Sequence, residues 1–350
     1  MRVVCALSGG VDSAVAAALL KQQGYEVIGV HLRLFEQGSL CCGSAGYESA
    51  RRLAGQLGIP FYVMNLQAEF EQLVINDFCA EYRQGRTPNP CIRCNRLIKF
   101  GLLRQRAVAL GAEFIATGHY ARIVKDQSGR FHLYRGVDPG KEQSYFLYHT
   151  SQEQLAGLLL PVGAMTKGQV RMRARELGLP NAERPESQEI CFIPDNDYAR
   201  FLKKRHPEFF QAGPVYDLSG RRLGTHSGIV NFTIGQRKGL GLALGERRYV
   251  VRIDPGENAV YLGTENDAYQ RRVWAGAVHW IGPAPAGPVR VWAKVRYQSP
   301  GGKAVVNPLP DFRVYIEFDE PQWAPTPGQA VVLYDGDEVL GGGTIEASQP

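Results

Sequence analysis

Apolar runs and helical patterns alternate through the first half of the chain. Short apolar runs typical of buried strands cover residues 3–7, 27–32, 61–65 and 113–117. The spacing of apolar residues between them predicts helices from Ala14 onward and over residues 47–57, 68 to about 82, and 95–110. Strands that alternate with helices favour an α/β fold with a doubly wound parallel sheet, which we expect to extend to about Pro194.

The pattern changes in the second half of the chain. Residues from about 195 to 267 form short segments rich in Gly, Lys and Arg. After Arg272 the helical spacing disappears, and the alternating runs 289–297, 312–318 and 330–334 are separated by Gly/Pro turns. This pattern predicts a small central domain followed by an antiparallel sandwich or barrel. We place the domain boundaries at 1–197, 198–270 and 271–350.

Composition narrows the class of protein. A chain of 350 residues is too long to fold around one ordinary hydrophobic core, so we expect two or three domains. Its 44% apolar and 21% charged residues are a normal balance for a soluble globular protein. No apolar run approaches the roughly 20 residues of a membrane helix. Ser8-Gly9-Gly10 also breaks the apolar run that a signal peptide needs, so we expect a cytosolic protein.

Charge and cysteine content add two constraints. A net charge of +6 permits a polyanionic partner without requiring one. Seven cysteines, an odd number in a reducing compartment, favour thiol chemistry or metal binding over a disulfide scaffold.

The segment between the first strand and the first helix has the chemistry of a phosphate-binding loop. It reads Ser8-Gly9-Gly10-Val11-Asp12-Ser13. Two glycines allow a sharp turn, while the hydroxyls and the start of the helix offer donors and a positive dipole end to an anion. An ordinary strand–turn–helix corner is the alternative, in which Asp12 is only a helix N-cap. The spacing is neither that of the Walker loop nor that of the dinucleotide fingerprint.

This loop resembles the SGGxDS pyrophosphate loop (PP-loop) of the ATP-pyrophosphatase superfamily. Those enzymes activate a carbonyl or carboxylate oxygen by adenylation and release pyrophosphate. The resemblance implies ATP as a substrate, with Asp12 placed to help hold Mg²⁺ against the phosphates.

A second informative stretch, residues 85–96, contains a Cys-x-x-Cys pair, Cys91 and Cys94, where a helix is expected to begin. A helix N-terminus and the nearby arginines favour thiolate over thiol, so we expect Cys94 to be reactive. On spacing alone, half of a zinc site completed by Cys41-Cys42 stays open as the alternative. Gly118 and His119 follow a buried strand, at the end where the site residues of parallel sheets gather.

Several motifs in order along the chain resemble the tRNA-specific 2-thiouridylases. They are Gly-Arg-Thr-Pro-Asn-Pro before Cys94-Asn95, and the segments 116–120, 143–147, 189–193, 233–241 and 340–345. The matches run from the first strand to the C-terminus. The resemblance implies a PP-loop catalytic domain, a central adaptor domain that binds tRNA, and a C-terminal antiparallel β-barrel.

The resemblance also implies a reaction, the ATP-dependent 2-thiolation of the wobble uridine of tRNA. The uracil 2-carbonyl oxygen is adenylated, and sulfur then replaces it. By position, Cys94 and Cys191 are the catalytic cysteines. Cys191 would carry a persulfide from a sulfur-donor protein or sulfide, and a Cys94–Cys191 disulfide would remain. From its own neighbours, Ile-Cys-Phe-Ile, Cys191 is typical of a buried structural thiol.

Binding residues carry over in the same way. Those implied for ATP are Ala6, Leu7, Ser8, Gly9, Gly10, Val11, Asp12, Ser13, Leu32 and Gly118. Those implied for tRNA are Asn89, Pro90 and Cys91 at the target base, and His119, Lys141, Glu142, Gln143, Arg296, Tyr297 and Gln329 elsewhere.

One departure from the family pattern opens a second route for sulfur. Many family members carry Asp where this chain has Cys91. Cys91, Cys94 and Cys191 form a set of three thiols that could hold a 4Fe–4S cluster with one iron open for hydrosulfide. Two further alternatives are another PP-loop adenylating enzyme, which would not need Cys94 or Cys191, and a non-catalytic tRNA-binding protein with a zinc or redox clip.

Overall fold

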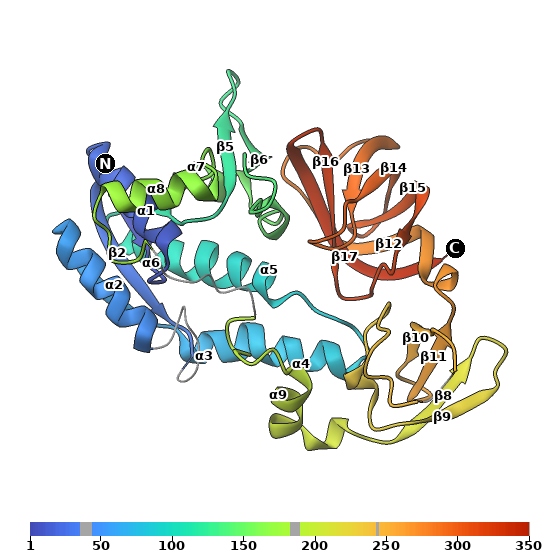
Figure 1. Ribbon diagram of the computed structural model, residues 1–350. Helices are drawn as coiled ribbons and strands as arrows, with labels where there is room; N and C mark the ends of the chain where they lie inside the picture. The colour runs from blue at the N-terminus through green and yellow to red at the C-terminus, as the bar shows by residue number, and fades with distance from the viewer. Residues whose placement is uncertain (36–43, 183–189, 243–244, 350) are drawn as a thin grey trace. The chain divides into compact units, whose positions relative to one another are not determined.

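The structure, a computed structural model, describes residues 1–35, 44–182, 190–242 and 245–349 (Figure 1). The chain divides into two compact units, and each is built from separate stretches of sequence. The first contains residues 1–75, 90–196 and 337–339; the second contains 76–89, 197–336 and 340–350. In the part of the chain that is described, no helix is both long and apolar enough to cross a membrane.

The first unit is built on a parallel sheet with strand order β3-β2-β1-β4-β7. Its strands are β1 (Arg2–Ala6), β2 (Glu26–Arg33), β3 (Phe61–Asn65), β4 (Phe114–Ala116) and β7 (Leu158–Leu159). Its longer helices are α1 (Val11–Gln22), α2 (Ser44–Leu57) and α8 (Lys167–Glu176), with α7 (Gln152–Ala156) and the 3-10 turn η3 (Ser144–Phe146). Apolar residues of β1, α1, α2 and α8 share one core, which explains why β1 and α1 are almost wholly apolar. The α/β parallel-sheet prediction is confirmed.

A long helical segment leaves β3 and passes from the first unit to the second and back. It consists of α3 (Gln67–Phe70), η1 (Glu71–Ile75) and α4 (Asn76–Arg83), then α5 (Pro90–Cys94), η2 (Asn95–Leu103) and α6 (Arg104–Ala109). Both η segments are π-helical. The helix expected at residue 95 therefore begins earlier, at Pro90, since proline is well suited to a first helical position.

A hairpin, β5 (Ala121–Lys125) and β6 (Phe131–Arg135), projects from the first unit. Residues 337–339, which include the first two residues of β17, also belong to this unit, and Glu338 pairs with Tyr134 of β6.

The second unit holds two sheets. A mixed sheet has strand order β10-β11-β8-β9 and surrounds an apolar core that includes Val215, Val250 and Leu262. Its strands are β8 (Gly213–Asp217), β9 (Arg222–His226), β10 (Tyr249–Asp254) and β11 (Ala259–Gly263), accompanied by α9 (Tyr198–Arg205), η4 (Pro207–Phe209), η5 (Ile229–Asn231) and η6 (Asn266–Ala268).

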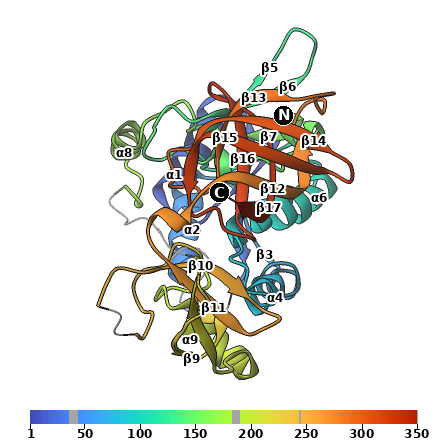
Figure 2. The same cartoon turned by 90° about the vertical axis from the view of Figure 1, so that its right-hand side faces the viewer.

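The C-terminal sheet closes on itself as an antiparallel barrel, with strand order β12-β15-β14-β13-β16-β17 and a closing β12–β17 pairing (Figure 2). The strands are β12 (Tyr269–Trp280), β13 (Val289–Lys294), β14 (Gly302–Leu309), β15 (Arg313–Trp323), β16 (Ala330–Asp335) and β17 (Glu338–Gln349). Alternate residues such as Val291, Ala293 and Val295 fill its interior. The sequence left a sandwich or a barrel open, and the barrel is what forms.

Candidate active site

The glycine loop joins β1 to α1 at the carboxyl end of the parallel sheet. Gly9 has φ +80°, a conformation that favours glycine. Gly10 is the N-cap of α1, and no described side chain caps the first turn. The Ser13 hydroxyl accepts from the Ser8 amide at 3.3 Å and donates to the Gly10 carbonyl at 3.0 Å. The loop is therefore rigidly folded, and the start of α1 is left to meet an anion.

Two side chains from outside the loop fix its central peptide. Ser49 Oγ and Asn181 Nδ2 both donate to the Gly9 carbonyl, at 3.1 and 2.6 Å. Both side chains are buried. Neither residue was predicted, because each reaches the loop from a distant part of the chain.

Gly118, two residues beyond the end of β4, packs directly against the loop. A Cβ atom at Gly118 would lie 2.6 Å from the Ser13 nitrogen and 2.7 Å from the Asp12 carbonyl carbon. Only glycine allows this approach, so Gly118 adjoins the loop as the sequence suggested. Ala6 ends β1, and Leu32 lies near the end of the neighbouring strand β2.

Asp12 is held by two residues that sequence reasoning missed. Lys167 Nζ lies 2.7 and 2.9 Å from the two carboxylate oxygens, and the Tyr120 hydroxyl donates to Oδ1 at 2.5 Å. The Lys167 ammonium also lies over the Tyr120 ring, 5.8 Å from its centroid. Tyr120 was part of a motif that we quoted, but its role is visible only in three dimensions.

The three cysteines of interest belong to the same unit. Cys94 is buried at the end of α5, Cys91 is exposed one turn earlier, and Cys191 is half-buried. Cys191 and Cys91 each help to raise the pKa of the Cys94 thiol, so the three thiols lie within electrostatic range of one another. Phe192, next to Cys191, is buried against Phe70, with ring centroids 5.7 Å apart.

The expected thiolate at Cys94 is wrong for this structure. Burial raises the pKa of the Cys94 thiol to about 12, and the nearby Lys99 opposes this only in part. Cys94 ends the short helix α5 and continues into η2, so it does not sit at a helix N-terminus. The prediction failed because the helix starts at Pro90, five residues before the predicted start at Asn95, and because Cys94 is buried.

Among the residues that the structure describes, no group of side chains fits a resident metal or iron–sulfur cluster. Across the described ranges, no three His, Cys, Asp or Glu side chains are grouped so that they could hold a metal ion. Cys41 and Cys42, the other half of the zinc alternative, lie outside the described residues. A Mg²⁺ ion that arrives with ATP is different, because phosphate oxygens supply most of its ligands and one carboxylate is enough. Asp12 fits that need.

The residues implied for tRNA in this unit are largely engaged internally. The Tyr120 amide donates to Gln143 Oε1 at 3.0 Å, and the Ser144 amide donates to buried Glu142. His119 is hydrogen-bonded to Thr117 at 2.7 Å. Burial and then the charge of Lys99 lower the pKa of His119 well below its usual value, so the ring is neutral at pH 7. Lys141 is half-buried.

In the second unit, residues of the motif 233–241 and Gln329 meet at the segment that precedes Cys91. Gln329 Nε2 donates to the carbonyls of Thr87 and Pro88, at 2.9 and 3.3 Å. The hydroxyls of Thr87 and Thr233 lie 3.0 Å apart. The Thr87 amide donates to the Pro327 carbonyl at 2.8 Å. Gln329 therefore acts here as a support for residues 87–89, which end in Asn89.

Arg296, also implied for tRNA, joins the central sheet to the barrel. Its guanidinium donates to the Ile234 carbonyl at 2.7 Å and to Thr326 Oγ1. Tyr297 follows Arg296 in the sequence, and the centroid of its ring lies 5.8 Å from the Lys294 ammonium.

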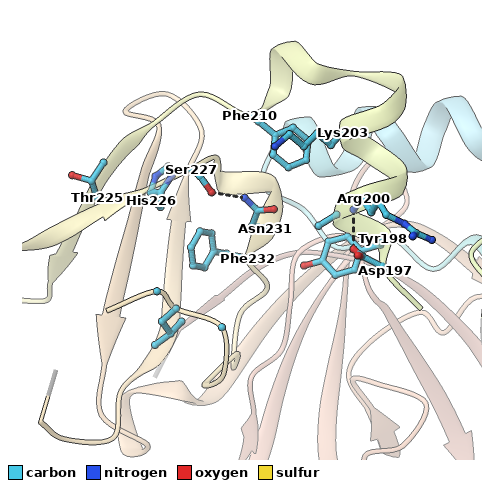
Figure 3. Close-up of a pocket in the computed structure, with 14 residues that line it drawn as sticks. Asp197, Tyr198, Arg200, Lys203, Phe210, Thr225, His226, Ser227, Asn231 and Phe232 are labelled. Atoms are coloured by element: carbon cyan, nitrogen blue, oxygen red, sulfur yellow. Dashed lines mark hydrogen bonds between the residues drawn. The ribbon is translucent and has the colours of Figure 1, made fainter. Parts of the chain in front are cut away.

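The second unit also contains an open cavity of about 660 Å³ between α9 and the loop 239–241 (Figure 3). Lys203 lies over the Phe210 ring, 5.9 Å from its centroid, and Asn231 donates to Ser227 Oγ at 3.3 Å. His226 in the wall donates from Nε2 to the Asn258 carbonyl and accepts at Nδ1 from the Gly228 amide. Both ring nitrogens are thus used, and burial lowers the pKa of His226.

Family models match nearly the whole chain. A tRNA methyl transferase HUP domain matches residues 1–195, a tRNA methyl transferase PRC-barrel domain residues 199–264, and an aminomethyltransferase beta-barrel domain residues 270–345.

Curated relatives resemble the chain over almost its full length. The tRNA-specific 2-thiouridylase MnmA of Moorella thermoacetica is 52% identical, covering 98% of each chain. Those of Heliobacterium modesticaldum and Geotalea uraniireducens are 51% and 49% identical, covering 98% and 99% of this chain and 92% and 95% of the relatives. A 4-thiouridine synthetase–RNA complex with bound ATP is structurally similar at a TM-score of 0.38 and 17% identity, covering 59% of this chain and 50% of that one. From these sequence matches, the chain is a member of the tRNA-specific 2-thiouridylase family.

Proposed function

We propose that this protein 2-thiolates the wobble uridine of tRNA in two steps, adenylation followed by sulfur transfer. The observation that carries the proposal is the arrangement of the first unit. One unit holds a glycine loop suited to phosphate and a buried cysteine, Cys94, with Cys191 and Cys91 as neighbours. Membership of the 2-thiouridylase family supports tRNA uridine as the substrate. It also argues against the two alternatives, another adenylating enzyme and a non-catalytic tRNA-binding protein.

In the first step, the uracil O2 attacks the α-phosphorus of ATP. A bond forms between O2 and phosphorus, the bond from phosphorus to the bridging oxygen breaks, and pyrophosphate leaves. The amides and hydroxyls of residues 8–13 bind the departing charge, and Ser49 and Asn181 keep the loop in shape. Mg²⁺, which Asp12 would help to hold, supplies charge neutralisation at the phosphates.

In the second step, the terminal sulfur of a Cys191 persulfide, supplied by a sulfur-donor protein, attacks C2. The C2–O bond breaks, AMP leaves, and the base stays linked to Cys191 through two sulfurs. Cys94 then attacks the Cys191 sulfur, and its thiol proton is lost to solvent. Thiolated uridine leaves, a Cys94–Cys191 disulfide forms, and an external dithiol reduces it. We prefer this route to the iron–sulfur one because the described residues do not group as metal ligands.

Mass spectrometry tests the reaction directly. An unmodified tRNA transcript is incubated with protein, ATP, Mg²⁺, a low-molecular-weight persulfide and a dithiol. The expected product gains sulfur for oxygen at the wobble uridine only. Cys94→Ser and Cys191→Ser should each abolish this gain while tRNA binding is kept. Cys79→Ala, a change on α4 of the second unit, is the control and should keep activity.

Two outcomes would contradict the proposal. Thiolation that persists in Cys94→Ser or Cys191→Ser would contradict the catalytic role proposed for that cysteine. A wild-type protein that adenylates no uridine in the presence of tRNA and ATP would remove the reaction itself.

A further inference from the structure

The ion pair between Lys167 and Asp12 occupies the part of the glycine loop where a metal would be needed. The Lys167 ammonium contacts both Asp12 oxygens, and its side chain is only 11% exposed. Asp12 is 28% exposed, so the carboxylate can still be approached from one side. Tyr120 donates to Oδ1 as well, which leaves little room for a further ligand on that oxygen.

The backbone of Lys167 is fixed independently of this pair. Lys167 is the first residue of α8, behind the N-cap Thr166 and its capping box with Gln169. Its amide donates to Asp138 Oδ2 at 2.8 Å. Val170 and Ala174 bury the helix in the shared core. Since α8 has these anchors, the ion pair is not needed to hold the helix, and the long side chain can move while its backbone stays.

An ammonium and a divalent metal compete for the same carboxylate. Both are cations that need the Asp12 oxygens, and placing both there together would bring like charges into contact. A lysine side chain, with a flexible stem and a compact charge, can change partners where an arginine fork could not do so as readily.

From these observations we propose that Lys167 is a mobile counter-ion, which holds Asp12 before nucleotide binds and moves to the phosphates of ATP when Mg²⁺ takes its place. The inference rests on the proposed use of ATP by this loop. With ATP bound, Lys167 neutralises charge on the departing pyrophosphate. Without ATP, its ion pair with Asp12 keeps a metal ion from binding to the carboxylate. The Tyr120 hydroxyl stays on Asp12 in both states and keeps the carboxylate in position.

Metal binding without tRNA or sulfur tests this inference. Mn²⁺ serves as the probe, and its binding is followed by electron paramagnetic resonance in the absence of nucleotide. Lys167→Met should raise the Mn²⁺ affinity of the free protein about tenfold, the effect expected of removing one close and partly shielded charge. The same variant should bind a non-hydrolysable ATP analogue more weakly than wild type. The double variant Lys167→Met/Asp12→Asn should lose the gained Mn²⁺ affinity.

Two further variants separate this role from a structural one. Arg173→Met removes an exposed charge from the same helix, where Arg173 pairs with Glu176, and should change neither affinity. Lys167→Arg keeps the charge and should exclude Mn²⁺ while slowing pyrophosphate release. A stability role alone would leave Mn²⁺ affinity unmoved in a folded Lys167→Met protein.

The inference is overturned if Mn²⁺ affinity of Lys167→Met stays at the wild-type value, or if the variant binds the ATP analogue as tightly as wild type. Both readouts are independent of thiolation. Failure of the two-step reaction with a positive Mn²⁺ result would therefore refute the proposed function and leave the counter-ion exchange standing.

Discussion

Single residues decide whether the glycine loop can form, and the clearest example is Gly118, where a side chain would not fit. Its place in the fold leaves no space for a methyl group, because the nearest atoms are the backbone of Asp12 and Ser13, which cannot rotate away. The loop is also fixed by Ser49 and Asn181, which both donate to the Gly9 carbonyl. Any displacement must therefore change the geometry offered to phosphate.

We predict that Gly118→Ala weakens ATP binding more than it weakens the fold. Overpacking of this kind costs about 1–3 kcal/mol, which corresponds to roughly a 5- to 150-fold loss of ATP affinity if the strain falls on the loop. Calorimetric titration with an ATP analogue and a thermal melt measure the two effects. Gly55→Ala is the matched control, since nothing lies within 4 Å of its Cβ on α2. Unchanged ATP affinity in Gly118→Ala would show that the loop tolerates the shift.

Cys94 gives a second prediction at this scale. With its pKa raised to about 12, the thiol stays protonated at pH 8. Its thiolate fraction is then about a thousandfold smaller than that of an ordinary cysteine, whose pKa is about 8.5. In the protein without tRNA, iodoacetamide should modify exposed Cys91 first and Cys94 only as pH rises toward 12. Peptide mass spectrometry after timed labelling at several pH values follows both sites. Equal rates at pH 8 would contradict the burial argument.

At the scale of elements, the sequence predicted those strands and helices whose apolar residues follow a regular local pattern. The strands of the parallel sheet are short apolar runs, and the strands of the barrel alternate, so both were visible as patterns. The hairpin β5–β6 was missed because its residues are mostly half-buried or exposed and carry no clean alternation. Helix α8 was missed because only Val170 and Ala174 of its ten residues are buried.

The site was predictable only where it is contiguous. Residues 8–13 form one motif, and Gly118 follows strand β4 by two residues. Lys167, Ser49 and Asn181 reach the loop from remote positions, and no local pattern signals such contacts. The assignment of Cys94 and Cys191 came from the family resemblance, and their roles stay a prediction. The three domain boundaries, which were placed from the change of pattern along the chain, also stay a prediction.

The hairpin gives a prediction in which pH is the variable. His132 on β6 lies between Glu338 Oε1 at 2.6 Å and Asp126 Oδ2 at 3.0 Å. Hydrogen bonds to Glu338 and then Asp126 raise the pKa of His132, and the same contact helps to lower the pKa of Asp126. A raised folded pKa means that the stabilisation is fully present below the unfolded value of about 6.5 and is lost as pH rises through the folded value.

Amide hydrogen exchange in β6, corrected for the intrinsic effect of pH, should therefore show protection that falls as pH rises above about 6.5. His132→Gln should lower protection at acidic pH and remove most of this dependence. The exposed pair Arg290–Asp319 on the barrel offers a control: Arg290→Gln should leave β6 unaffected. A pH-independent wild-type hairpin would refute the role of His132.

At the scale of the whole molecule, the chain is organised around segments that cross between units. Residues 76–89 leave the first unit, are fastened inside the second by Gln329 and Thr233, and return at Pro90. The segment that re-enters the first unit carries Cys91 and Cys94. Within the second unit, motif 85–90 thus meets motif 233–241 at Thr87 and Thr233, and Gln329 at Thr87 and Pro88. This contact is a physical reason for these residues to occur together.

The net charge of +6 leads to the last prediction, which concerns how tRNA is held. Helix α9 ends in Lys203, Lys204 and Arg205, and Lys203 lines the cavity beside Phe210. If this helix contacts tRNA phosphates, affinity should fall with salt, and each lost contact should reduce the slope of log K against log[salt] by about 1. Lys203→Gln/Lys204→Gln should therefore lower affinity at low salt and flatten the slope by up to about 2, equally for all tRNA sequences. Lys303→Gln, an exposed position on barrel strand β14, is the matched charge control. Filter binding measures the tRNA affinity of each variant across a series of salt concentrations. A slope that the α9 substitutions leave unchanged would show that Lys203 and Lys204 do not contact tRNA phosphates.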